Sequence, residues 1–219
     1  MSAGARVEAV RARIAAACER SGRSPGDVRL VAVSKYLDDD TVDALVAAGV
    51  EDLGENRYQQ LRDRAPRWPS VRWHAIGPLQ ANKVRYVARW ASAFHALDGV
   101  ALAADLSQRR LAEGLAPLPC FVQVNVAGEA TKSGVAVEDV ADLLAGLVAG
   151  GHRGVEVVGL MAMPPLAHEP EASRRWFRAL AQLGADHGLA GLSMGTSADF
   201  EVAVEEGATV VRLGGVLAG

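Results

Sequence analysis

Cysteines, runs of like charge and long apolar stretches are all scarce in this chain, and each scarcity excludes a class of protein. The 219 residues contain two cysteines, Cys18 and Cys120, which have neither the spacing of a metal site nor the density of a disulfide framework. No run of Lys or Arg builds the positive face that nucleic-acid binding needs, and the net charge is -3. We therefore expect a protein of a reducing compartment that binds no metal and no nucleic acid.

Apolar stretches are too short to cross a bilayer. Asp142 interrupts the apolar segment 140–149 well before the roughly 20 residues that a spanning helix needs. The first residues also lack the apolar core of a signal peptide. With 50% hydrophobic residues and no linker rich in Pro, Gly or Ser, the chain can bury one large core. We expect a soluble cytoplasmic protein with no membrane partner, folded as a single domain over residues 1–219.

Strand-like and helix-like segments alternate through the chain. Short apolar runs predict strands at 29–34, 52–54, 73–76, 93–97, 120–126, 155–160, 191–194 and 210–213. Helical periodicity predicts helices at 41–48, 57–65, 81–90, 101–113, 137–149, 171–187 and 198–206, after an opening helix at 7–21 that plugs or flanks the fold. This alternation predicts an α/β fold, a single-domain (β/α)8 TIM barrel with an extra N-terminal helix.

A doubly wound open sheet is the competing architecture. Its first strand–helix turn would carry a glycine-rich phosphate loop, whereas residues 34–39 of this chain, Ser-Lys-Tyr-Leu-Asp-Asp, contain no glycine. The three aspartates at 38–40 lack the spacing of a calcium loop, and we expect them to cap the next helix. The barrel is favoured, and functional groups are then expected at the carboxyl ends of its strands.

One lysine stands at the end of a strongly apolar strand. Lys35 follows the run Val-Arg-Leu-Val-Ala-Val-Ser, so its ammonium is either solvated at the strand end or held for chemistry. A lysine whose charged form is disfavoured by partial burial becomes an amine nucleophile that forms a Schiff base with an aldehyde. This position indicates a carbonyl ligand.

Two later segments have the composition of an anion site. Residues 193–197, Ser-Met-Gly-Thr-Ser, precede a predicted helix, and residues 212–215, Arg-Leu-Gly-Gly, end the last predicted strand. Barrels often bind phosphate with the loops after strands 7 and 8. Each segment alone is equally typical of a turn, a helix cap or a chain end. Together with Lys35, they favour a ligand that has both an aldehyde and a phosphate.

Seven motifs in order resemble the pyridoxal-phosphate homeostasis protein family. They are Val33-Ser-Lys35, Gly54-Glu-Asn56, the segment 73–83, Gln123-Val-Asn125 with the segment 128–134, Gly159-Leu-Met161, Leu192-Ser-Met-Gly195 with Ser197-Ala-Asp-Phe200, and Val211-Arg-Leu-Gly214. The resemblance covers most of the chain. It implies a barrel similar to the N-terminal domain of alanine racemase, without the second domain, and pyridoxal phosphate as the cofactor.

The resemblance also implies roles for single residues. Lys35 would hold the cofactor as a Schiff base, Arg212 would approach the pyridine nitrogen, and Asn56 would lie beside the ring. The phosphate would lie on Ser197 and on the amides of Gly214 and Gly215. The implied cofactor-binding set, with no catalytic residue and no metal ligand, is Lys35, Asn56, Met161, Ser193, Gly195, Thr196, Ser197, Arg212, Gly214 and Gly215.

Two members of this set depart from the family pattern. Thr196 replaces a usual methionine, and Gly215 replaces a usual threonine. The hydroxyl lost at position 215 costs about 0.5 to 1.5 kcal/mol if nothing replaces its hydrogen bond. We expect cofactor binding to survive this loss.

The function implied by the resemblance is a non-catalytic carrier of pyridoxal phosphate for intracellular cofactor homeostasis. Its partners would be the cofactor and apo-enzymes that accept it, and the chain would be a monomer or a weak dimer. Arg212 beside the pyridine nitrogen makes the ring a poor electron sink. The alternative partner of Arg212 is a nearby carboxylate such as Glu205 or Glu206.

Two enzymatic functions remain as alternatives. A pyridoxal-phosphate-dependent racemase or decarboxylase would need a second base, and Tyr36 is expected to point away from Lys35 if strand alternation continues through it. A Schiff-base aldolase acting on phosphorylated sugars would need no chromophore. His74 is expected in the core or at an interface.

Overall fold

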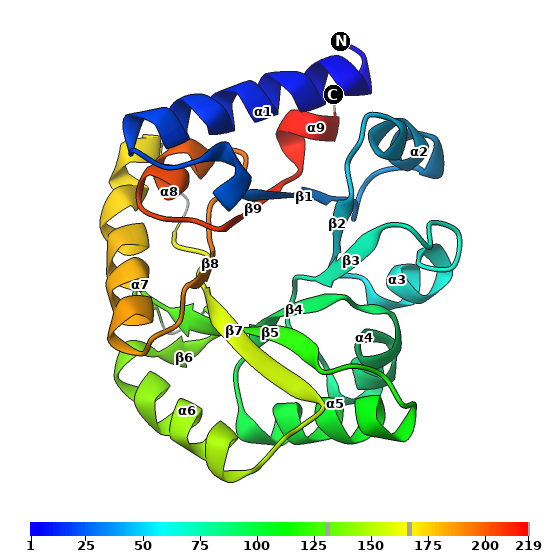
Figure 1. Ribbon diagram of the computed structural model, residues 1–219, viewed down its shortest axis with the longest axis vertical. Helices are drawn as coiled ribbons and strands as arrows, with labels where there is room; N and C mark the ends of the chain where they lie inside the picture. The colour runs from blue at the N-terminus through cyan, green and yellow to red at the C-terminus, as the bar shows by residue number, and fades with distance from the viewer. Residues whose placement is uncertain (130–131, 166–167, 219) are drawn as a thin grey trace.

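A closed parallel barrel forms the centre of the computed structural model, which describes residues 1–129, 132–165 and 168–218 (Figure 1). Its strands are β1 Arg29–Val33, β2 Asp52–Glu55, β3 Arg72–Ala75, β4 Ala93–Leu97, β5 Leu118–Asn125, β7 Val155–Met161, β8 Gly191–Ser193 and β9 Val210–Leu213. They pair in the order β4-β3-β2-β1-β9-β8-β7-β5, and the parallel pairing of β4 with β5 closes the ring. The predicted (β/α)8 barrel is confirmed, and the open sheet is excluded.

Helices surround the barrel, close to the predicted positions. They are α1 Ala3–Arg20, α2 Asp39–Ala47, α3 Tyr58–Arg64, α4 Val84–Trp90, α5 Val100–Ala112, α6 Val140–Ala149, α7 Arg174–Asp186, α8 Phe200–Glu205 and α9 Gly215–Ala218. The predicted starts at 81, 137 and 171 fall in or beside the short 3-10 turns Ala81–Lys83, Val137–Asp139 and Pro170–Ser173. The sequence predicted neither α9 nor the short strand β6 Val135–Ala136, which pairs with β5.

The opening helix flanks the barrel instead of plugging it. Val7, Val10 and Ile14 recur at helical spacing and are buried. α1 lies along the outside of the molecule, against α8, α9 and α2 (Figure 1). Across the described ranges, no helix combines the length and the apolar character that crossing a membrane requires.

The strands are apolar because parallel strands in a barrel are covered on both faces. Every residue of β2 and of β4 is buried, although Asp52, Glu55 and His95 are among them. Buried polar groups of this kind need partners. The polar residues inside the barrel therefore indicate a hydrogen-bonding network in its interior.

Candidate functional site

Lys35 lies in the turn after β1, at the carboxyl end of the barrel. β1 ends at Val33, and the Leu37 N–H donates to the Ser34 carbonyl oxygen across the turn at 3.0 Å. Lys35 is half-buried, and its Nζ lies 4.7 Å from the centroid of the Tyr36 ring, which is 75% exposed. The prediction that Tyr36 points away from Lys35 is wrong, because the strand and its alternation of sides end before residue 36.

Two buried charged side chains hold this turn. Arg64 of α3 donates to the carbonyl oxygens of Ser34 at 3.0 Å and Leu37 at 2.6 Å, on either side of Lys35. Glu55, fully buried at the end of β2, accepts from the Ser34 hydroxyl at 3.2 Å and lies 3.7 Å from the Arg64 guanidinium. Because removing one partner of a buried ion pair is costly, this pair fixes the backbone that carries Lys35.

The aspartates after the turn have the expected structural role. The Asp38 carboxylate accepts from the Thr41 N–H at 2.8 Å and caps α2. Hydrogen bonds from Thr41, from its side chain first and its backbone N–H second, lower the pKa of Asp38. The turn is thus held at its start by Glu55 and Arg64 and at its end by a helix cap.

Arg212 of β9 is buried and has no carboxylate within ion-pair distance among the residues that the structure describes. It donates to the Ser193 hydroxyl at 2.5 Å and to the Ala162 carbonyl oxygen at 3.1 Å, and burial lowers its pKa to about 10. Glu205 and Glu206, the alternative partners, pair with Arg174 instead. A buried cation without a counter-ion is costly, so the position favours a ligand that brings an acceptor.

The two predicted anion-binding segments meet at the same end of the barrel. The backbone N–H groups of Gly214 and Val216 donate to the Ser197 hydroxyl oxygen at 3.2 and 3.4 Å. A Cβ added at Gly215 would stand 3.8 Å from that oxygen, so the glycine keeps this side of the hydroxyl open. We call this cluster of a hydroxyl and backbone N–H groups the donor cradle; its donors are of the kind that bind phosphate, and here the two N–H groups donate to Ser197.

Gly195 and Thr196 shape the loop that presents Ser197. Gly195 has a φ of +92°, and a Cβ there would come within 2.6 Å of the Ala203 Cβ, so only glycine fits. The N–H and the hydroxyl of Thr196 both donate to the Asp199 carboxylate, at 2.8 and 3.1 Å. α8 accordingly begins after Asp199, two residues later than predicted.

The predicted site residues come from five neighbouring strands, in the order β2, β1, β9, β8 and β7. Asn56 is exposed after β2, whereas Met161 at the end of β7 is 1% exposed and lies beside Ser193 in strand register. The structure therefore brings the whole predicted set onto one arc of the barrel. Sequence reasoning missed Arg64 and Val216, because no local pattern marks a helix arginine or a backbone amide as part of a site. Residues 130 and 131 of the 128–134 motif lie outside the described residues.

Comparison with known proteins places this architecture in a family. The profile described as alanine racemase, N-terminal domain, matches residues 6–219. A pyridoxal phosphate homeostasis protein of Aquifex aeolicus is 37% identical over 227 residues, covering 100% of this chain and 98% of the relative. The chain belongs to the pyridoxal phosphate homeostasis protein family. The pyridoxal phosphate homeostasis protein of Pseudomonas aeruginosa is 41% identical, over 96% of this chain and 92% of the relative.

Solved structures agree with the family membership. PipY of Synechococcus elongatus PCC7942 with PLP bound is 30% identical, with a TM-score of 0.80 over 96% of this chain and 100% of that chain. An unknown protein from Bifidobacterium adolescentis is 31% identical, with a TM-score of 0.88 over 98% of this chain and 94% of that chain. Alanine racemase of Clostridium difficile 630 is 12% identical and has a TM-score of 0.71, over 94% of this chain and 55% of that chain, which shows a shared fold alone.

Proposed function

We propose that this chain binds and carries pyridoxal phosphate, held as a Schiff base on Lys35. The observation that supports this most is the buried Arg212, which has no carboxylate within ion-pair distance in the described ranges and shares one arc with the donor cradle and a half-buried lysine. Pyridoxal phosphate has three matching groups: an aldehyde for the amine, a phosphate for the cradle and a ring nitrogen for the guanidinium. The names of the relatives and the PLP-bound PipY structure support the same cofactor.

Each residue of the predicted set has a place in this arrangement. The Ser197 hydroxyl and the amides of Gly214, Gly215 and Val216 hold the phosphate, and Val216 is an addition to the set. Arg212 approaches the ring nitrogen. The remaining members border the ring, support Arg212 or shape the phosphate loop, and they are Asn56, Met161, Ser193, Gly195 and Thr196.

The names of the relatives support a carrier rather than an enzyme. Bound pyridoxal phosphate would supply an electrophilic carbon and an electron-withdrawing ring. The charge of Arg212 disfavours protonation of the ring nitrogen, so the ring withdraws electrons weakly. We therefore propose a cytoplasmic homeostasis protein without a catalytic residue, a single domain over residues 1–219 and a monomer or weak dimer, which passes the cofactor to apo-enzymes.

Borohydride trapping tests the attachment point. The chain contains three lysines, Lys35, Lys83 and Lys132, so peptide mass spectrometry can assign a reduced adduct without ambiguity. After incubation with pyridoxal phosphate, we expect a yellow protein and a phosphopyridoxyl adduct at Lys35. Lys35→Ala should lose the adduct and the colour, whereas the control Lys83→Ala should keep both. An adduct that survives Lys35→Ala unchanged would refute the proposal.

Incubation with amino acids separates the carrier from the racemase or decarboxylase. We expect loaded protein to leave L-alanine and other amino acids without inversion or loss of carbon dioxide over hours. Turnover at an enzyme-like rate, on the order of 1 per second or faster, would replace the carrier by an enzyme. A colourless protein that cleaves a phosphorylated sugar would instead favour the aldolase.

A further inference from the structure

A line of polar side chains crosses the barrel interior beneath Arg212. The Ser193 hydroxyl accepts from Arg212 and lies 2.7 Å from Nδ1 of His95. On the other side of the ring, Nε2 of His95 lies 2.8 Å from Nδ1 of His74. Finally, Nε2 of His74 lies 2.8 Å from the Asp52 carboxylate. All five side chains belong to residues that are at most 4% exposed. We call Asp52, His74, His95 and Ser193 the polar column.

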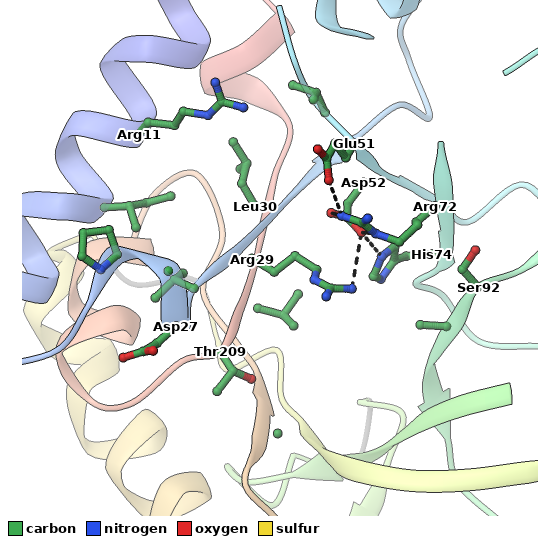
Figure 2. A pocket seen from close by; sticks show the side chains of 18 of the residues that line it. Arg11, Asp27, Arg29, Leu30, Glu51, Asp52, Arg72, His74, Ser92 and Thr209 are labelled. Carbon is green, nitrogen blue, oxygen red and sulfur yellow. Dashed lines mark hydrogen bonds and ion pairs between the residues drawn. The ribbon is translucent and has the colours of Figure 1, made fainter. Parts of the chain in front are cut away.

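The far end of the polar column reaches a cavity at the opposite, amino-terminal end of the barrel. Asp52 and His74 line this cavity of about 1060 Å³, where Arg72 and Arg29 surround the carboxylate (Figure 2). Arg72 donates to Asp52 at 2.6 and 2.8 Å, and Arg29 lies 3.6 Å from it. The column therefore connects a paired carboxylate at one end of the barrel with Arg212 at the other, which forms no ion pair with any residue that the structure describes.

The charge states of the column follow from its surroundings. Burial raises the pKa of Asp52, but hydrogen bonds from His74 and Arg72 outweigh burial and hold this pKa far below its usual range. Burial lowers the pKa of His74, and it lowers that of His95 further. At neutral pH the column thus contains one carboxylate and two neutral imidazoles.

These charge states decide every proton position in the column. An ionised Asp52 only accepts, so Nε2 of His74 carries the hydrogen, and Nδ1 of this neutral ring accepts. Nε2 of His95 must then donate to His74, so Nδ1 of His95 accepts the Ser193 hydroxyl hydrogen. Ser193 is left with its lone pairs facing Arg212. The dipoles of the three neutral groups, His74, His95 and Ser193, align with their negative ends toward the cation and their positive ends toward the carboxylate.

We propose that the polar column is a positioning network that fixes the guanidinium of Arg212 at the cofactor ring. Aligned hydrogen bonds in a buried chain strengthen one another, so the column stabilises a cation that has no carboxylate within ion-pair distance among the described residues. The ionised Asp52 sets the direction of the whole chain from the other end of the barrel. This role rests on the proposed function, because it needs a ring nitrogen beside Arg212.

Nitrogen NMR of the unliganded protein tests the proton positions. We expect His74 and His95 to be neutral Nε2–H tautomers at pH 7, each with an unprotonated Nδ1. Finding Nδ1–H on His95 would overturn the proposal, because Ser193 could then no longer donate to it. This measurement needs no cofactor, so its outcome does not depend on the proposed function.

Two substitutions of His95 test the effect on the cofactor. In His95→Asn the side-chain amide oxygen can take the place of Nδ1 and accept from Ser193. The His95 ring stacks on Phe121 with 4.5 Å between ring centroids. His95→Phe keeps this stacking but has no atom that accepts a hydrogen bond. The absorbance of bound cofactor changes at a characteristic pH. We expect His95→Phe to raise this pH by about 0.5 to 1 unit. We expect its cofactor affinity to fall about tenfold, and that of His95→Asn to fall less than about threefold.

The outcomes distinguish the two proposals. Equal behaviour of both variants, or no spectral shift in either, would overturn the positioning role while leaving the Lys35 adduct intact. Absence of the adduct from the unsubstituted protein would overturn the proposed function itself. If His95→Phe does not fold, Ser193→Ala removes the acceptor of Arg212 directly and should shift the spectrum in the same direction.

Discussion

At the scale of single residues, two buried arginines, Arg110 and Arg212, differ in how fully hydrogen bonds compensate their charge. Arg110 of α5 is 8% exposed, and its guanidinium donates to the carbonyl oxygens of Ala88 and Ala116. Arg212 is buried as deeply, and a hydroxyl and one carbonyl oxygen accept from it. Its desolvation is therefore less compensated in the unliganded protein.

Replacing Arg212 by methionine should lower cofactor affinity without lowering the stability of the folded protein. We expect Arg212→Met to leave the free energy of unfolding of unliganded protein unchanged or to raise it by up to about 3 kcal/mol, because a poorly compensated buried charge is removed. Cofactor affinity should fall about tenfold or more, since a charge-assisted hydrogen bond is lost. Urea denaturation and titration with pyridoxal phosphate measure the two effects.

Arg110→Met is the matched control for this change. It should lower the free energy of unfolding by about 1 to 3 kcal/mol, because buried carbonyl oxygens lose their donor, and it should leave cofactor affinity unchanged. Equal losses of affinity in both variants would show that burial of an arginine, and not the place of Arg212, controls binding.

At the scale of elements, the turn between β1 and α2 depends on contacts from α3. The residues of this turn lack a β-branched or apolar pattern that would hold them, and the Arg64 guanidinium bridges the carbonyl oxygens of Ser34 and Leu37. Glu55 connects the same turn to the end of β2. The position of Lys35 is thus a property of three elements together.

Arg64→Met should loosen this turn. We expect a loss of about 2 to 4 kcal/mol in the free energy of unfolding, because Glu55 stays buried without its cation. Trapping at Lys35 should also become slower, as the amine is less well placed. The control Arg62→Met, an exposed residue of the same helix paired with the exposed Asp63, should change stability by less than about 0.5 kcal/mol. Similar losses in both variants would contradict a specific role for Arg64.

The whole molecule is a closed ring, so polar groups inside it can find partners on distant strands. The polar column takes its members from β2, β3, β4 and β8, and Asp52 is its ionised end. A carboxylate with a lowered pKa in the folded state stabilises the protein above its unfolded pKa, and this contribution disappears as the pH falls toward the lower folded value.

Acid should therefore unfold the barrel partly through Asp52. We expect the free energy of unfolding to decline below about pH 4, where an unfolded aspartate takes up a proton. Asp52→Asn should be less stable at pH 7 and should show a flatter decline between pH 4 and pH 2. Urea denaturation over this range measures both curves, and parallel curves for the two proteins would exclude Asp52 as a contributor.

The strands and the order of the site residues were predictable because they depend on local patterns. The predicted bounds of β4 and β9 agree with the structure, since a strand covered on both faces is mostly apolar, and His95 and Arg212 are the single polar residues in these two strands. The sequence alone could place Lys35, Gly214 and Gly215 after predicted strands and Arg212 near the end of the last one. The side of Tyr36 was predicted wrongly, because a turn ends the alternation on which the prediction rested.

The amino-acid sequence by itself determined the barrel and the arc of strand ends on which the site residues stand, because hydrophobic periodicity and the order of elements are properties of neighbouring residues. Only the tertiary structure decided that Arg212 donates to Ser193 and Ala162, that Arg64 holds the lysine turn, and that His74 and His95 join Asp52 to Ser193. The histidines lie 21 residues apart in sequence, and Ser193 lies 98 residues beyond His95. Such contacts depend on barrel closure, which brings distant strands within hydrogen-bonding distance of one another.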